Sequence, residues 1–214
     1  MDTPPLQIWD EPHKTKTEKK SRKRTQRGTE NNVSAKRSLF TRPELLEHLG
    51  RDWYFATSLW RGEEYFHFRV YEEKNGVRIP TPKGVSLRPS QLKQLLDCAT
   101  TLMNTADETM KDPNVKEYAF HIGYGTYVTV KQETVRWIDI RRFFKPDGCE
   151  SPVHTRKGAM LRSEEFTRFV ELIPKIYEHS PSLWNIQVCD CIFGGNQMAF
   201  LMCKACNPFD SVNW

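Results

Sequence analysis

The sequence predicts an α+β protein that contains two tandem β-β-β-β-α repeats and ends in a cysteine-rich β hairpin. The first observation is a duplicated motif, because residues 83–88 read Lys-Gly-Val-Ser-Leu-Arg and residues 157–162 read Lys-Gly-Ala-Met-Leu-Arg. The second is that each copy follows an aromatic-rich β pattern and precedes an amphipathic helix. One short sheet and one helix bury little apolar surface alone, so the duplication predicts that two copies cover each other.

The charge distribution separates a basic tail from a neutral folded part. The net charge is +5, and residues 1–38 carry ten Lys or Arg against five Asp or Glu, so the tail holds the whole excess. Its polar composition predicts disorder. The basic run at residues 19–24 is typical of a nuclear import signal or a nucleic-acid tether, and a solubilising tail is the alternative. We therefore expect a nuclear protein.

Several classes of function are disfavoured by what the sequence lacks. Residues 123–125 read Gly-Tyr-Gly, but the rest of a dinucleotide or phosphate-binding fingerprint is missing, and no metalloprotease or serine-hydrolase motif occurs. No apolar run near Met1 resembles a secretion signal, and no window of about 18 apolar residues could cross a bilayer. We expect neither catalysis nor a membrane partner, and an intracellular location in which six cysteines are thiols or metal ligands.

The first repeat is predicted at residues 51–103, after a short helix at residues 39–50. That helix is suggested by the capping-box pattern Thr-Arg-Pro-Glu at residues 41–44 and would end at Gly50. Two aromatic strands follow, with turns at residues 61–63 and 75–76, where glycine tolerates positive φ. Pro89 then opens a helix with an apolar stripe at Leu92, Leu95, Leu96 and Ala99.

The second repeat is predicted at residues 118–179, after a linker at residues 104–117 that is irregular or loosely helical. Strands are expected around residues 127–131 and 135–143. Ser163 is expected to cap the closing helix, and Pro174 to kink it near its end.

The remaining residues, 180–214, are predicted to form a cysteine-rich β hairpin with its turn at residues 194–196. The hairpin would bring a C-x-C pair close to a C-x-x-C pair. Four thiolates could hold zinc tetrahedrally, and buried thiols are the alternative. The four candidate ligands are Cys189, Cys191, Cys203 and Cys206.

Four segments of the second repeat carry a family pattern in order and spacing. They are residues 120–123 (Phe-His-Ile-Gly), 127–131 (Tyr-Val-Thr-Val-Lys), 138–144 (Ile-Asp-Ile-Arg-Arg-Phe-Phe) and 155–158 (Thr-Arg-Lys-Gly). Together they resemble the single-stranded DNA-binding domain of the transcriptional coactivator family called positive cofactor four. Residues 53–103 resemble it less closely. The resemblance implies curved antiparallel sheets and an intramolecular pseudo-dimer, in which both halves of a family homodimer lie in one chain.

The resemblance also implies a groove in which bases stack on aromatic rings while Arg and Lys neutralise phosphates without reading sequence. The first repeat keeps the family's aromatic-basic-glycine turn at residues 60–62, whereas the second has Glu133, which would repel phosphate. Trp60 and Phe144 could instead cover the sheet or lie in the core. The nine predicted nucleic-acid contacts are Trp60, Arg61, Arg69, Lys83, Lys131, Arg141, Phe144, Arg156 and Lys157.

Two functions remain in competition. The first is binding of single-stranded or melted DNA with low sequence specificity, in transcription or replication. The second is a protein-interaction scaffold on a duplicated coactivator-like fold, with transcription or replication proteins as partners and the basic tail as an import signal. The near-neutral charge of the folded part does not favour nucleic acid over protein as its partner, so the scaffold stays an alternative.

Overall fold

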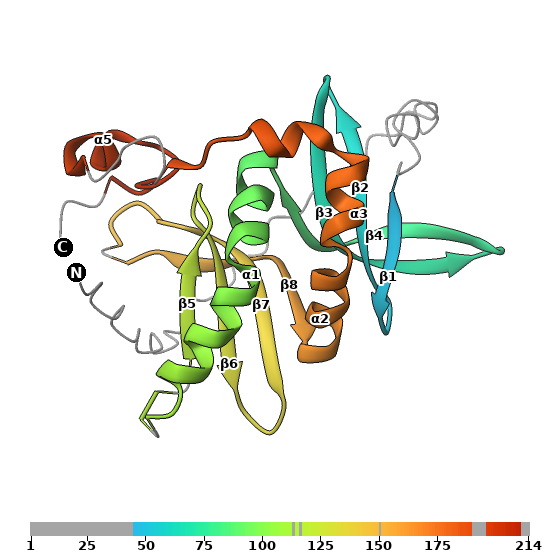
Figure 1. Cartoon of the computed structure of the whole chain (residues 1–214), viewed down its shortest axis with the longest axis horizontal. Helices are drawn as coiled ribbons and strands as arrows, with labels where there is room; N and C mark the ends of the chain where they lie inside the picture. The colour runs from blue at the N-terminus through green and yellow to red at the C-terminus, as the bar shows by residue number, and fades with distance from the viewer. Residues whose placement is uncertain (1–44, 113, 116, 150, 190–195, 211–214) are drawn as a thin grey trace, which may run out of the picture. The chain divides into compact units, whose positions relative to one another are not determined.

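Two four-stranded antiparallel sheets, each followed by a helix, form the folded part of the chain (Figure 1). The computed structural model describes residues 45–112, 114–115, 117–149, 151–189 and 196–210. Sheet A contains β1 (Leu46–Gly50), β2 (Trp53–Trp60), β3 (Glu63–Lys74) and β4 (Val77–Leu87), paired in that order. Sheet B contains β5 (Glu117–His121), β6 (Thr126–Gln132), β7 (Arg136–Phe144) and β8 (Val153–Arg162), also paired in order. The predicted α+β class is confirmed.

Tight turns close the hairpins of sheet A, as the sequence predicts. Arg61 and Gly62 have φ values of 52° and 81° between β2 and β3. Asn75 and Gly76 have φ values of 55° and 73° between β3 and β4. Paired positive φ values match the right-handed twist of the flanking strands, so both hairpins close in two residues.

The helices follow the sheets in chain order. The α1 helix (Pro89–Thr109) follows sheet A and continues into the residues predicted as a linker, with Leu102 and Ala106 buried along the same stripe. The α2 helix (Ser163–Glu171) follows sheet B, and α3 (Ile173–His179) follows α2 after a break at Leu172. Pro174 stands in the first turn of α3, so the predicted interruption is confirmed.

The start of α2 differs from the prediction by one residue. Ser163 is the first helical residue and not its cap. The carboxylate of Glu165 instead accepts a hydrogen bond from the backbone N–H of Arg162 at 2.8 Å, which satisfies one donor at the helix start.

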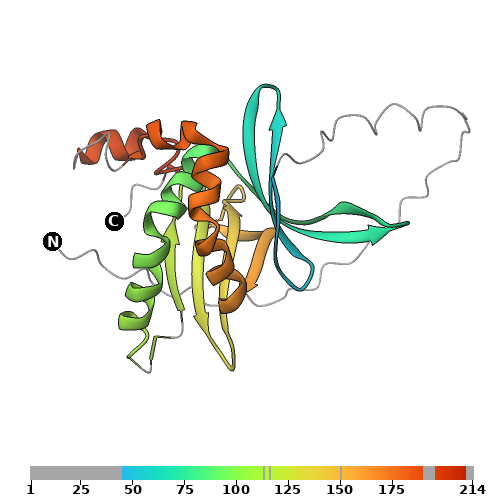
Figure 2. The same ribbon diagram turned by 45° about the vertical axis from the view of Figure 1, so that its right-hand side comes forward.

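Each helix packs against both sheets, including the one that it does not follow. Figure 2 shows α1 lying across sheet B, with α2 beside it. The Gln91 amide in the first turn of α1 donates to the Gly123 carbonyl and the Thr126 hydroxyl of sheet B, both at 2.9 Å. In the other direction, the Phe169 ring on α2 lies 4.8 Å from that of Phe68 in sheet A. The two halves therefore share one interior.

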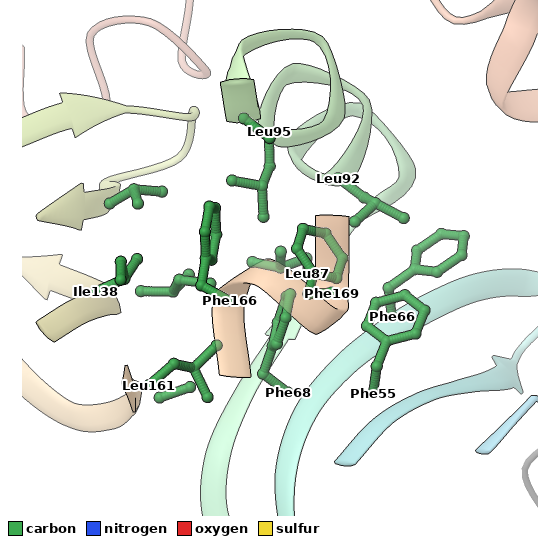
Figure 3. Packing of buried hydrophobic residues seen from close by; sticks show 14 of the residues in the cluster. Phe55, Phe66, Phe68, Leu87, Leu92, Leu95, Ile138, Leu161, Phe166 and Phe169 are labelled. Atoms are coloured by element: carbon green, nitrogen blue, oxygen red, sulfur yellow. The ribbon is translucent and has the colours of Figure 1, made fainter. Parts of the chain in front are cut away.

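The hydrophobic core is continuous between the two halves (Figure 3). Phe169 has no exposed surface, and its ring meets Phe55 of β2 at 5.5 Å and Phe166 of α2 at 5.7 Å. Leu92 and Leu95 of α1 lie in the same cluster. Residues from both sheets thus lose their contact with water together, which couples the folding of the two halves.

The short helix predicted at residues 39–50 is wrong where the structure describes it. Leu46–Gly50 is the strand β1, in which Leu46 pairs with Ala56 and His48 with Tyr54. The capping signal depended on residues 41–44, which lie outside the described residues, as does the basic tail. Backbone pairing with β2 and burial of Leu49 outweigh the local helical pattern.

The C-terminal β hairpin is also wrong in its described part. Gln197–Met202 forms the helix α5, and residues 181–185 form the 3-10 helix η1 (Pro181–Asn185) instead of leading into a strand. The side chain of Asn196 caps α5 by accepting from the Ala199 N–H at 3.1 Å. Asn196, predicted to lie in a turn, therefore caps a helix. Cys191 and the predicted glycines of the turn lie outside the described residues.

Candidate nucleic-acid interface

Strand alternation gives sheet A one apolar face and one polar, aromatic face. Phe66 and Phe68 of β3 point toward the helices, so Tyr65, His67 and Arg69 share the opposite face. On this outer face, His67 lies between two hydroxyls: Ser58 at 2.7 Å from Nε2 and Ser86 at 2.7 Å from Nδ1. Burial and the neighbouring Arg69 lower the pKa of His67 to about 4, so the imidazole is neutral at physiological pH.

The β2–β3 turn presents an aromatic and a basic side chain to solvent. Trp60 ends β2 and is 44% exposed. The Arg61 guanidinium lies over its ring at 5.7 Å, within cation–π range. Arg61 adopts the left-handed conformation of the turn, with a φ of 52°. An exposed indole beside a guanidinium provides a surface on which an unpaired base can stack.

A bulge in sheet A brings Arg69 against Gly84. The β3–β4 pairing shifts register between Arg69 and Tyr71, and Arg69 stands opposite Gly84. A Cβ at Gly84 would lie 2.3 Å from the Phe68 carbonyl oxygen, so only glycine fits. The Arg69 guanidinium donates to the Ser86 hydroxyl at 3.3 Å, and burial lowers its pKa. Next to the bulge, the Lys83 ammonium lies 5.6 Å from the Trp53 ring centroid.

Sheet B repeats this arrangement at the corresponding positions. Its β7–β8 pairing shifts register between Arg141 and Phe143, and Arg141 stands opposite Gly158. Arg141 is held by Asp139, with Nε 2.8 Å from the carboxylate, and by the Thr155 carbonyl at 2.9 Å. These two acceptors leave Arg141 less available to a phosphate than a solvated arginine would be.

The two sheets carry the same pair of ring contacts on their outer faces. In sheet A, His48 lies 4.8 Å from Tyr54, which lies 5.2 Å from Tyr71. In sheet B, the corresponding contacts are His121 to Tyr127 at 4.7 Å and Tyr127 to Phe143 at 5.1 Å. We define these two clusters as the ring triads. The ring triads are not among the predicted contacts, although each residue recurs after 72 or 73 positions.

The side chains of Thr81 and Thr155 make equivalent hydrogen bonds in the two sheets. The Thr81 hydroxyl donates to the Val70 carbonyl at 2.9 Å and accepts from the Lys83 N–H at 3.2 Å. The Thr155 hydroxyl donates to the Arg142 carbonyl at 2.7 Å and accepts from the Lys157 N–H at 3.1 Å. Both threonines therefore set the backbone of the basic segment that follows them.

The family comparison identifies the first of these two halves. Residues 48–98 match the family model for Transcriptional Coactivator p15 (PC4). The match runs from β1 into α1 and covers about a quarter of the chain. It falls on the half that resembles the family less closely by its motifs. The family model describes a transcriptional coactivator domain and not an enzyme.

Two further comparisons found no similar protein. Neither the curated proteins nor the solved structures contain a match to the chain. Within the described residues, no helix combines the length and apolar character needed to span a bilayer.

The first repeat's predicted contacts lie in the coactivator-matched half. Trp60 and Arg61 are at the β2–β3 turn, and Arg69 is beside the Gly84 bulge. Lys83 is also exposed in this half. Of these, Trp60 and Arg61 are brought together directly. Trp60 is not part of the core, because almost half of its surface is exposed.

The other predicted contacts lie in sheet B with unequal access to solvent. Phe144 ends β7 and is 49% exposed, so it is not a core residue. Arg156 and Lys157 are exposed on β8. Lys131 forms an ion pair with Glu117 at 3.3 Å. Arg156, Lys157 and Phe144 are therefore the most accessible predicted contacts of sheet B.

A basic and aromatic cluster joins the two sheets and was not predicted. The Trp137 ring in β7 lies 5.6 Å from the Arg51 guanidinium and 5.8 Å from that of Arg162. Arg51 comes from the β1–β2 turn of sheet A and also donates to the Met160 carbonyl at 3.3 Å. No local sequence signal marks this cluster, since it depends on contact between residues about 110 positions apart.

Proposed function

We propose that the protein binds single-stranded or melted DNA with little sequence preference, as a nuclear factor acting in transcription or replication. The observation that carries this proposal is the exposed Trp60–Arg61 pair at the tip of the β2–β3 turn, within the coactivator-matched residues 48–98. Base stacking on an exposed indole is tolerant of sequence because every base has a π face.

Sheet B is proposed to be a second, diverged copy of the same unit. Its strand order, its bulge opposite Gly158 and its ring triad correspond to those of sheet A. The packing of each helix against both sheets supports an intramolecular pseudo-dimer, in which one chain supplies both halves of a nucleic-acid groove. Linking the halves replaces association of two chains by an intramolecular contact.

The two halves would contribute different contacts. Sheet A supplies Trp60 and Arg61 at its turn, while sheet B supplies Phe144 with Arg156 and Lys157. The cations neutralise phosphates and the rings stack on bases. The basic run at residues 19–24 would act as an import signal and add a weak, sequence-independent attraction.

The test is a binding titration with an unpaired oligonucleotide and the matching duplex at two salt concentrations. It uses the full chain and a variant without residues 1–38. Trp60→Ala is expected to weaken binding to the unpaired strand by about 1–3 kcal/mol. Trp184→Ala is the matched control, because Trp184 is 66% exposed but lies on η1. Unchanged affinity in Trp60→Ala would contradict the proposed groove.

A protein-interaction scaffold is the second candidate, and one observation favours it. An apolar groove lies along α3 and η1, where the Tyr177 and Trp184 rings stack at 4.1 Å. Its occupant would be a segment of a transcription or replication protein. Equal, weak binding to single and double strands that disappears without residues 1–38 would favour the scaffold over the groove.

A further inference from the structure

Three cysteine side chains converge near the C-terminal end of the described residues. Cys189 follows η1, Cys203 directly follows α5, and Cys206 lies three residues further on. The three sulfur atoms all lie within 4.8 Å of one another. Residues distant in sequence are thus gathered into one cluster of soft ligands, which zinc and other thiophilic metals prefer.

The sulfur spacing fits metal coordination. Cys189 Sγ and Cys203 Sγ are 3.7 Å apart. Thiolates placed about 2.3 Å from a tetrahedral zinc ion lie about 3.8 Å from one another, whereas two sulfurs joined in a disulfide are about 2.05 Å apart. The two thiols are already at the separation that a shared metal ion requires.

The backbone around Cys203 and Cys206 forms a compact turn. The Asn207 N–H donates to the Cys203 carbonyl at 2.8 Å, which closes the loop containing both cysteines. Lys204 lies between them, and its ammonium pairs with the Asp210 carboxylate at 2.6 Å. A C-x-x-C turn that places two thiols on one side is a common half of a structural zinc site.

This turn is docked on sheet B. The Tyr124 N–H of the β5–β6 turn donates to the Ala205 carbonyl at 2.8 Å. Next to it, the Phe209 ring occupies the space above Gly125, where a Cβ would lie 2.8 Å from a ring carbon. The hydrogen bond that holds the C-terminal segment on sheet B is therefore made by Ala205, the residue next to Cys206 of the cluster.

We propose that Cys189, Cys203 and Cys206 bind Zn²⁺ as thiolates, and that the metal holds the C-terminal segment on the β5–β6 turn. Binding forms three Zn–S bonds and releases one proton from each thiol to the solvent. Cys191, the fourth ligand predicted from the sequence, lies outside the described residues, and the proposal stands on the other three. It is independent of nucleic-acid binding.

The first test measures metal on the full chain purified under reducing conditions. Elemental analysis is expected to find about one zinc ion per chain. Cys203→Ser and Cys206→Ser are expected to lose it, whereas Cys98→Ser and Cys149→Ser retain it, because those two thiols lie outside the cluster. Equal zinc content in all four variants would overturn the proposal.

The second test does not depend on the folding of any variant. Wild-type protein is stripped of metal by a chelator and titrated with Co²⁺, which should produce thiolate-to-cobalt charge-transfer bands with protons released in parallel. Hydrogen exchange in residues 196–210 and in the β5–β6 turn should slow when Zn²⁺ is restored. Absence of the charge-transfer bands, or a Cys189–Cys203 disulfide found by mass spectrometry in the reduced preparation, would refute the site.

Discussion

Gln91 and Glu165 make equivalent reciprocal contacts across the two halves of the fold. Each side chain accepts a hydrogen bond from the backbone N–H three residues before it, at 3.0 Å from Arg88 and 2.8 Å from Arg162. Each also crosses to the first turn of the other sheet, where Gln91 binds Gly123 and Glu165 binds Arg51. The residue whose side chain caps the N-terminus of each helix therefore also binds the opposite sheet.

Arg51→Ala is expected to destabilise the protein by about 2–3 kcal/mol, because it leaves the Glu165 carboxylate buried without its cation. Adding Glu165→Gln should recover most of this loss, since the neutral amide is the group that Gln91 provides in the other half. Urea unfolding measures both free energies. Lys111→Ala removes an exposed ion pair and serves as the control, with a change within about 0.5 kcal/mol. A comparable loss in the control would show that the Arg51 effect is not specific to burial.

Gly84→Ala is expected to be far more costly than Gly158→Ala, although the two glycines stand at corresponding bulges. At Gly84, φ is +147° and a Cβ would lie 2.3 Å from a backbone carbonyl, so the strand itself must move. At Gly158, the three nearest atoms all belong to the Arg141 side chain, at 2.7 to 3.0 Å, so a side chain and not the backbone must move. We expect a loss of at least about 3 kcal/mol at Gly84 and about 1 kcal/mol at Gly158.

Thermal unfolding followed by circular dichroism checks this order. Gly76→Ala is the control for positive φ alone, because nothing lies within 4 Å of the added Cβ there. Equal losses at Gly84 and Gly76 would mean that backbone conformation, and not the close approach to Phe68, explains the glycine.

Local signals predicted those parts of the fold that depend on neighbouring residues. The turns at Arg61-Gly62 and Asn75-Gly76 were found because positive φ has a residue preference of its own. The strand β1 was missed because its identity comes from pairing with β2, a tertiary interaction that a local helical pattern cannot report. For the same reason, no local pattern indicates that Gln91 and Glu165 cross between the sheets.

The candidate site was predictable only in its exposed members. Trp60 and Arg61 are adjacent in sequence, so a single turn brings them together. The ring triads need the strand register, which sets His48 beside Tyr54. The basic and aromatic cluster around Trp137 needs contact between Trp137 and Arg51 of the other sheet. At the C-terminus, three of the four predicted cysteine ligands converge: Cys189, Cys203 and Cys206. The segment before Cys203 is the helix α5 and not the predicted strand of a hairpin.

His121 should make stability dependent on pH between about pH 6.5 and pH 4. Burial lowers its pKa to about 4, and the Gly125 N–H donates to Nε2 at 3.2 Å, a contact that only the neutral ring can accept. Below the unfolded pKa of about 6.5 the unfolded state binds more protons, so this contribution is complete above that pH and declines as the pH falls toward 4.

The change His121→Gln tests this dependence. Its free energy of unfolding should vary with pH less steeply than that of the wild type, by about 1.4 kcal/mol per pH unit near pH 5. His67 also titrates in this range because its pKa is lowered to about 4, and it provides a common background in both proteins. Parallel pH profiles for the wild type and the variant would exclude a neutral, buried His121.

The salt dependence of DNA binding should report the exposed cations of β8. If Arg156 and Lys157 each neutralise a phosphate, replacing both with alanine reduces the slope of log K against log salt by about 1.4 for a single strand. Lys111→Ala removes one exposed cation from the residues after α1 and should leave the slope unchanged. An unaltered slope in the double variant would place the phosphate contacts elsewhere.

The packing of each helix against both sheets predicts that the two sheets unfold together. Phe169→Ala is expected to destabilise the protein by about 3–5 kcal/mol, because this fully buried ring on α2 fills the space above Phe55 and Phe68 of sheet A. Hydrogen exchange measured by mass spectrometry can follow peptides of β2–β3 and of β6–β7 separately. Both should lose the same protection in the variant, since the core is continuous between them. Met202→Ala is the control, because that side chain is 78% exposed. If β6–β7 kept its protection while β2–β3 lost it, the halves would be independent folding units and the shared core would not couple them.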